Sequence, residues 1–328
     1  MLLQAALAGV EEDDAPEAAE ESAEQAIYES ESSLDELADG MGRHRTEVEQ
    51  LVVGQWTEMF RWNEIAIAYL RFIVGVMPSD SSGTSVPPEV ALVFAELGSR
   101  AVSVAQEILI LLRSGFALGA HARWRALYET AVIGQVLAVG NRWTANRYRN
   151  HGYVRLSQDL SNLSSTTAEE DLAIAEMNRK CKVFTKRYGA SFSGQYGWAA
   201  ELTARKLGVK GPKFWHLEKL TDLSRMHDFY VSSHHDVHAD AIGLARLRGS
   251  EGLLHSGARV TAPTLLTCAT IDCVTTITET IGDVWQRHDA SRSAKYWMVA
   301  ALAAEIRATG TWATQSLATP IGDTASAS

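Results

Sequence analysis

The sequence predicts an all-α protein, a multi-helix bundle preceded by an acidic, poorly ordered N-terminal arm. Apolar residues recur at three- and four-residue spacing through most of the chain, which is the period of one face of a helix. Hydrophobic residues make up 46% and charged residues 21% of the 328 residues, a composition typical of a globular protein with a sizeable core. Nine tryptophans give that core bulky side chains.

The N-terminal arm carries most of the charge asymmetry. Residues 11–39 contain thirteen of the 40 Asp and Glu residues, and no Lys or Arg precedes Arg43. The other 27 acidic residues face 30 Lys and Arg, so the rest of the chain is nearly neutral although the net charge is −10. This near-neutral body weakens any argument that the protein repels nucleic acid, and it shows no strong basic signature for binding nucleic acid either. We expect residues 1–42 to form a flexible arm in which a nascent helix can form.

Helical patterns follow the arm in order. The segment 46–76 has an apolar stripe that only Asn63 interrupts, and 77–88 is a loop by composition. Pro88 stands where a helix can begin. The segment 114–140 is apolar almost all round, which predicts a central helix. The expected helices cover residues 46–76, 88–112, 114–140, 141–160, 166–189, 196–207, 216–241, 264–288 and 292–308.

Some of these boundaries depend on particular residues. Thr166 and Glu169 have the spacing of a capping box, and Gly189 ends that helix. The segment 264–288 is rich in Thr, Ile and Val, but its apolar residues recur with helical period, so we predict a buried helix. The glycine-rich segment 242–263 should form an ordered loop or a small hairpin. The helices make one domain over 43–310, and a flexible tail follows over 311–328.

Nothing in the sequence predicts export or a membrane span. The first ten residues, MLLQAALAGV, are apolar but contain no basic residue, so we expect no signal peptide. Charges interrupt each longer apolar stretch before about 20 residues, so no membrane partner is expected. Three cysteines are too few for a disulfide framework, and a cytoplasmic location follows. We expect no cofactor and leave homo-oligomerisation open.

The stretch HDFYVSSHHDVHAD, at 227–240, concentrates polar side chains inside the expected helix 216–241. At about 100° per residue, one face of that helix would carry Leu220, Leu223, His227, Val231, His234 and His238. Three histidines thus take positions where the pattern requires core. A buried imidazole without a partner costs about 1–3 kcal/mol, so these side chains should have partners or line a wet cavity.

Three interpretations of this histidine face stay open. The histidines are hydrogen-bonded core residues, or they bind a metal ion, or Ser233 and His238 form a pocket with a carboxylate from another helix. No HExxH motif or cysteine cluster accompanies the histidines, and we assign no metal ligands.

The central helix offers such a carboxylate. In HARWRALYET, His121, Arg125 and Glu129 lie four residues apart on one face of an otherwise apolar helix. An exposed Arg125–Glu129 pair would contribute only about 0.2–0.5 kcal/mol. Unpairing either member in an apolar environment would cost several times more. A buried Glu129 beside His238 would orient that imidazole for acid–base catalysis.

A third polar region is NRWTANRYRNHGYVR, at 141–155. Arg147, His151 and Arg155 share one face at four-residue spacing, and aromatic residues interleave with them. Basic and aromatic side chains together suit contact with RNA or phosphate. The alternative is a solvated basic face whose stems cover aromatic packing.

Three elements that arrive in order resemble a known family over about residues 95–250. They are an Arg-x-x-x-Glu pair on a central helix (Arg125 and Glu129), a tryptophan region (Trp215) and a Tyr…Ser…Val-His run, here Tyr230, Ser233, Val237 and His238. The chain resembles the bacterial family known as domain of unknown function 5677, which implies no particular activity.

A weaker resemblance is to the HEPN class of all-helical proteins, many of which are RNases in toxin–antitoxin and phage-defence systems. Their signature is an Arg followed after four to six residues by a His on a helix. Arg147 and His151 are one residue too close for that signature. Arg248 and His255 fit the count but lie in the glycine-rich segment.

These observations lead to two main functional hypotheses. In the first, a polar pocket makes the protein an enzyme that acts on RNA or a nucleotide, a HEPN-like defence or toxin component. The catalytic residues would be His238 as acid–base, Glu129 as its orienter, Arg125 as anion binder and Ser233, with Tyr230, His234, Arg147 and His151 binding ligand. In the second, the same residues form a buried network in a non-catalytic regulatory or interaction module. A further alternative is a metal-dependent hydrolase that uses His227, His234 and His238.

Overall fold

The computed structural model describes residues 16–76, 86–160, 167–238, 241–245, 263–288 and 293–318, and within them it is helical, with no strand. The α-helices are α2 (Pro16–Gln55), α3 (Thr57–Val76), α4 (Pro88–Arg113), α5 (Ala117–Val139), α6 (Arg142–Leu160), α7 (Ala168–Tyr188), α8 (Ala200–Leu207), α9 (Phe214–Glu218), α10 (His227–Val237), α11 (Ala241–Ala245), α12 (Thr264–His288) and α13 (Ser293–Ala318). Short 3-10 turns are η2 (Ala190–Ser193), η3 (Gly197–Ala199) and η4 (Asp222–Met226). The all-α prediction is confirmed.

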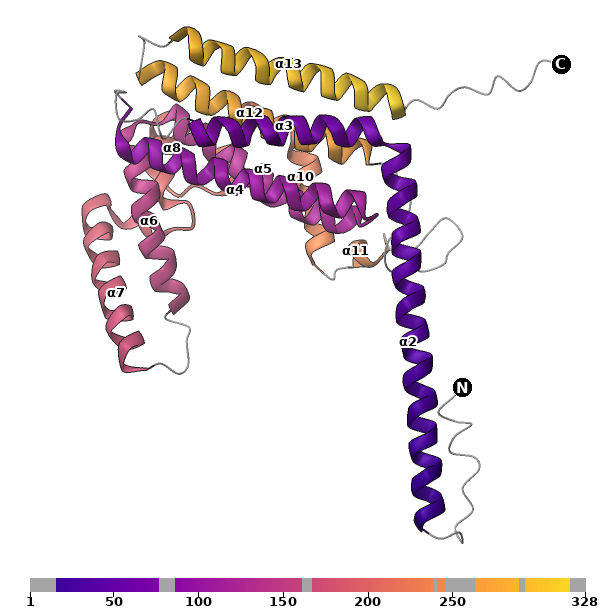
Figure 1. The fold of residues 1–328 in the computed structure, drawn as a ribbon. Helices are drawn as coiled ribbons and strands as arrows, with labels where there is room; N and C mark the ends of the chain where they lie inside the picture. The colour runs from indigo at the N-terminus through magenta and orange to yellow at the C-terminus, as the bar shows by residue number, and fades with distance from the viewer. Residues whose placement is uncertain are drawn as a thin grey trace, which may run out of the picture.

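Helices α3, α4, α5, α12 and α13 form the body of the bundle, and α10 crosses beside α5 (Figure 1). Helices α6 and α7 make an antiparallel pair that extends from one end of this body, and α2 projects from the other end. The core holds large side chains from separate helices, with Trp124 and Tyr128 on α5 and Trp285 on α12 all fully buried. None of the described helices is long and apolar enough to cross a membrane.

Helix α12 shows how a segment rich in β-branched residues becomes helical. Four of its threonine hydroxyls donate to carbonyls four residues earlier, as Thr270 does to Leu266 and Thr278 to Val274, at 2.7 and 2.9 Å. These bonds satisfy the four hydroxyls inside the helix, which helps the segment to be buried on nearly every side. The prediction of a buried helix over 264–288 is confirmed.

The acidic N-terminal segment is helical from Pro16 on, as the first part of α2. The expected helix 46–76 is divided, because the chain bends at Trp56 between α2 and α3 (Figure 1). The Thr57 hydroxyl donates to the carbonyl of Val53 at 2.7 Å, and Gly54 follows Val53 in the chain. Both a hydroxyl bonded to a carbonyl four residues earlier and a glycine favour a bend in a helix.

Three other boundaries differ from the sequence-based expectations. The capping box of α7 uses Thr167 and Glu170, one residue later than expected. Helix α13 continues to Ala318, past the expected end at 308, and Gly310 within it lies close to Ile271 and Trp62. In the glycine-rich segment, residues 241–245 form the short helix α11, and the rest of the expected loop or hairpin, through 262, lies outside the described residues.

The prediction of one continuous helix over 216–241 is wrong. The chain instead forms α9, the 3-10 turn η4 and then α10, which ends at Val237. Leu220 and Leu223 therefore do not continue the face of α10. The region between α9 and α10 turns because Thr221 caps η4, its hydroxyl accepting from the Leu223 amide at 3.3 Å.

Candidate functional site

A polar cluster joins α5 to α10. The Arg125 guanidinium donates through Nε to Glu129 Oε1 at 3.1 Å and through Nη2 to the Tyr230 hydroxyl at 3.0 Å. Its Nη1 donates to Nδ1 of His234. The Tyr230 hydroxyl in turn donates to Glu129 Oε1 at 2.8 Å. We call Arg125, Glu129, Tyr230 and His234 the Arg125 cluster.

The direction of each hydrogen bond in the Arg125 cluster follows from the donor groups. A guanidinium only donates, so His234 must accept at Nδ1 and carry its proton on Nε2. Tyr230 accepts from Arg125 and donates to Glu129. Burial, reinforced by the neighbouring Glu129 carboxylate, raises the pKa of Tyr230, so its hydroxyl stays protonated.

The Arg125 cluster lies at the boundary between core and solvent. Tyr230 is buried at 9% exposure, whereas the side chains of Arg125 and Glu129 are 25% and 34% exposed. His234 is exposed. Tyr196 flanks the cluster, where burial, with Glu129 adding to it, raises its pKa to about 12. Tyr230 therefore forms the buried side of the site, and Arg125, Glu129 and His234 form its solvent-accessible side.

Two predicted catalytic residues do not join this cluster. Ser233 is fully buried, and its hydroxyl donates to the Tyr230 carbonyl on the same helix at 2.6 Å. His238 follows the last residue of α10 with extended backbone and is exposed. Its ring lies against His234, with centroids 4.4 Å apart, and not against Glu129. The end of the helix at Val237 moves His238 off the face on which a continuous helix would have placed it.

The expected buried histidine face is the exposed face of α10. His227, Val231, His234 and His238 are all exposed, while Tyr230 and Ser233 are buried. Within the ranges that the structure describes, no three His, Cys, Asp or Glu side chains are grouped as a metal site would need. The metal-binding alternative therefore lacks its set of ligands there.

His227 has a different partner that the sequence did not indicate. Its Nδ1 lies 3.1 Å from both carboxylate oxygens of Glu218, and Glu218 is only 2% exposed. The Tyr128 hydroxyl donates to Glu218 Oε1 at 2.8 Å. Burial and Glu218 raise the pKa of Tyr128, so it stays a donor. Glu218 is 90 residues from Tyr128, so no local spacing could reveal this contact.

His121 forms a second pair that sequence reasoning missed. Its Nδ1 is 2.5 Å from Asp236 Oδ2, and its Nε2 is 3.2 Å from the Phe229 carbonyl. The Phe229 ring also stacks on His121 with centroids 4.2 Å apart. Only 1% of the Asp236 side chain is exposed. The spacing of His121 and Arg125 was visible in the sequence, but the placement of Asp236 depended on the true buried face of α10.

Arg147 and His151 lie elsewhere, at the base of the α6–α7 pair. Arg147 donates to the carbonyls of Trp198 and Gly197, each at 3.0 Å, and His151 Nε2 is 2.8 Å from the Gly194 carbonyl. Both side chains are 4% exposed. The expected RNA-binding surface is therefore not formed by these two residues, which instead hold η2 and η3. Arg248 and His255 lie outside the described residues.

Fold and site together define an all-α protein with a polar cluster between a central helix and a short crossing helix. Residues 91–252 match the model of the family of unknown function (DUF5677), which confirms the resemblance to that family. The match includes the Arg125 cluster and both histidine–carboxylate pairs, but not α12 or α13. No curated protein and no solved structure matches the chain.

Proposed function

We propose that the protein is a binding protein for a phosphate-bearing ligand, an RNA or a nucleotide, and that the Arg125 cluster is its ligand site. One observation carries this proposal. A partly exposed guanidinium and an exposed imidazole that carries its proton on Nε2 lie side by side on two packed helices. Such N–H donors are the groups that recognise phosphate oxygens, and the bonds among Arg125, Glu129 and Tyr230 fix them in advance.

The hydrogen bonds in the cluster favour recognition over proton transfer. Glu129 Oε1 accepts from both Arg125 and Tyr230, and Tyr230 is held protonated. A general base needs an acceptor directed at the substrate, and Glu129 Oε1 is already engaged by these two donors. We do not extend the proposal to a HEPN-like nuclease, because Arg147 and His151 donate to backbone carbonyls inside the protein.

Binding of a labelled single-stranded RNA, with nucleoside mono- and triphosphates as competitors, tests this proposal. Arg125→Gln and His234→Ala should each weaken binding about tenfold or more, because each removes a charge-assisted or directed donor. His44→Ala is the matched control, since His44 is exposed on α2, which contributes no residue to the cluster, and it should bind like the wild type. Equal affinity in all four proteins would contradict the proposal, as would RNA cleavage that His238→Ala abolishes.

A second candidate function is a non-catalytic module in which the cluster only fixes α10 on α5. The buried Tyr230, which bonds to both Arg125 and Glu129, favours it. Denaturant unfolding separates the two candidates. If the cluster is purely structural, Arg125→Gln will lower the free energy of unfolding by about 1–3 kcal/mol, and neither RNA nor nucleotide will bind the wild type.

A further inference from the structure

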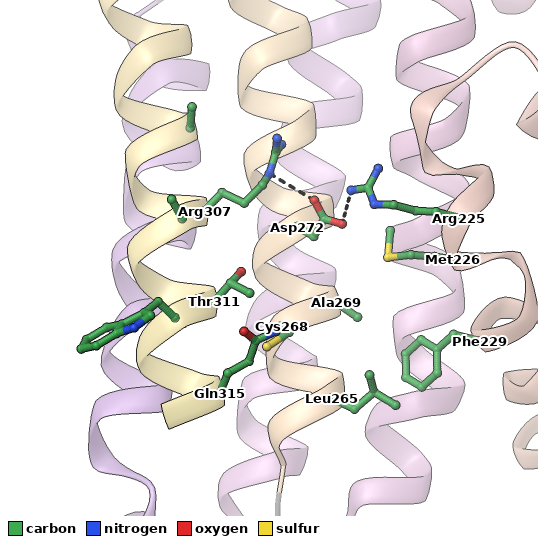
Figure 2. Close-up of a pocket in the computed structure, with 13 residues that line it drawn as sticks. Arg225, Met226, Phe229, Leu265, Cys268, Ala269, Asp272, Arg307, Thr311 and Gln315 are labelled. Atoms are coloured by element: carbon green, nitrogen blue, oxygen red, sulfur yellow. Dashed lines mark hydrogen bonds and ion pairs between the residues drawn. The ribbon is translucent and has the colours of Figure 1, made fainter. Parts of the chain in front are cut away.

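A cavity of about 600 Å³ lies apart from the Arg125 cluster, over the outer face of α12. Figure 2 shows its floor, in which Leu265, Cys268, Ala269 and Asp272 follow one another on that face. One wall is α13, and the opposite wall is the segment from η4 to the start of α10, including Phe229. The cavity thus lies between the segment matched by the family and the C-terminal helix pair.

The two ends of this cavity differ in chemistry. One end is apolar, formed by Leu265, Ala269, Phe229 and the neighbouring Met226. The other end is ionic, because Arg225 and Arg307 both pair with the single carboxylate of Asp272 (Figure 2). The volume of the whole cavity is in the range of pockets that hold small molecules, and the cavity is too small for a protein helix.

The ionic end has donor capacity beyond its internal bonds. In the part of the chain that the structure describes, Arg225 donates to the Asp222 carbonyl and to Asp272, which uses two of its five N–H groups. Its side chain is 52% exposed. Arg307 is more enclosed and also bonds Glu279, Thr275 and Thr276. Arg225 is therefore the cation best placed to meet an incoming anion.

Two large apolar side chains that line the cavity are strongly exposed to solvent. Leu265 is 66% and Trp312 is 71% exposed, and both line the cavity. Exposed large apolar side chains grouped at one depression are typical of binding sites.

We propose that this cavity binds a small amphipathic monoanion, a carboxylate or sulfonate with an aromatic or aliphatic body. The body lies along Leu265, Ala269 and Phe229, and the anionic group meets the guanidinium of Arg225. The cavity is distinct from the Arg125 cluster, so this proposal does not depend on the one above. Phe229 lines this cavity, and its carbonyl and ring also contact His121 on α5.

Titration of the full chain with the fluorescent probe 1-anilinonaphthalene-8-sulfonate tests the proposal. We expect saturable binding that Arg225→Gln weakens about tenfold. Ala308→Trp, at an exposed position lining the cavity, should abolish binding by filling it. Arg179→Gln is the matched control, because Arg179 is an exposed partner of Glu176 on α7, and it should bind the probe like the wild type. Thermal unfolding of each variant identifies any that fails to fold.

Protection of Cys268 from alkylation locates the bound molecule. Cys181→Ser removes the other partly exposed thiol, and Cys273 is buried, so N-ethylmaleimide should then report on Cys268. Naphthalene-2-carboxylate should slow this alkylation severalfold, and neutral 2-naphthalenemethanol should slow it less. Probe binding that leaves Cys268 unprotected would overturn the proposal, as would equal affinity in Arg225→Gln and the wild type. The alkylation result decides the matter even if Ala308→Trp does not fold.

Discussion

Arg147 and His151 lie one helical turn apart on α6, and both donate to backbone carbonyls of the segment around η2 and η3. The Arg147 guanidinium also lies over the ring of Tyr188 at 4.9 Å and over that of Phe192 at 5.3 Å. Buried carbonyls need donors, and these two side chains provide them where the chain is irregular. At the scale of single residues, this part of the protein is therefore held by side-chain donors in place of a regular helix.

His151 makes the stability of this region depend on pH. Burial, with nearby Arg155 and Arg147, lowers the pKa of His151 below its ordinary value. Between the folded and unfolded pKa values the unfolded chain binds more protons, so His151 contributes stability above about pH 6.5 that is lost as the pH falls. We expect the free energy of unfolding to decrease from about pH 7 to pH 5, and His151→Gln to reduce that decrease.

Urea unfolding at several pH values measures this effect. His44→Gln is the control, because His44 is an exposed histidine on α2 and its replacement should leave the pH dependence unchanged. Parallel curves for His151→Gln and the wild type would show that His151 is not the titrating group.

At the scale of a single element, the start of helix α7 is stabilised by Thr167, the residue that precedes it. The Thr167 hydroxyl accepts from the Glu170 amide at 3.3 Å, and the Glu170 carboxylate accepts from the Thr167 amide at 2.7 Å. Two amides at the helix start, which have no partner within the helix, are satisfied in this way. The sequence contains TTAEE, so a register one residue earlier has the same spacing.

The choice between these two registers is testable. Thr167→Ala should lower the free energy of unfolding by about 1 kcal/mol, because it removes the cap, as measured by denaturant unfolding. Thr166→Ala should have little effect, because Thr166 is not the capping residue. The reverse result would place the cap at Thr166 and contradict the structure.

At the scale of the whole molecule, helix α4 lies very close to α3 and α12 at Gly98. Gly98 on α4 lies so near α3 and α12 that an added Cβ would be 2.3 Å from Val74 Cγ2 and 3.4 Å from Ile281 Cδ1. By contrast, an added Cβ at Gly134 on α5 would meet nothing within 4 Å. These two helical glycines therefore have different reasons to be present.

Alanine at each glycine separates the two cases. Gly98→Ala should destabilise the fold by about 1–3 kcal/mol, because the added methyl group overlaps the stiff side chain of Val74. Adding Val74→Ala should recover part of that loss, measured as a coupling energy in a double-mutant cycle. Gly134→Ala should be neutral or stabilise by up to about 1 kcal/mol. A Gly98→Ala protein as stable as the wild type would mean that the helices are further apart.

Much of the fold could be predicted from local pattern. Helix α4 begins at Pro88 as expected, and α12 covers the expected 264–288. The meeting of Arg125 with Tyr230 and His234 required tertiary contact between segments about 105 residues apart. Local spacing could not find the break before His227, because no proline or glycine marks it. A continuous helix through this point would exchange the buried and exposed faces of α10.

The sequence by itself determined that the chain is helical and that Arg125 and Glu129 pair on one face of a central helix. Both conclusions follow from the three- and four-residue spacing of a helix, which is a local property of the sequence. Only the tertiary structure decided which histidines have partners. His121 with Asp236 and His227 with Glu218 depend on where α9 and η4 turn the chain. A helical face is buried or exposed according to what packs against it, and that information lies in the other helices.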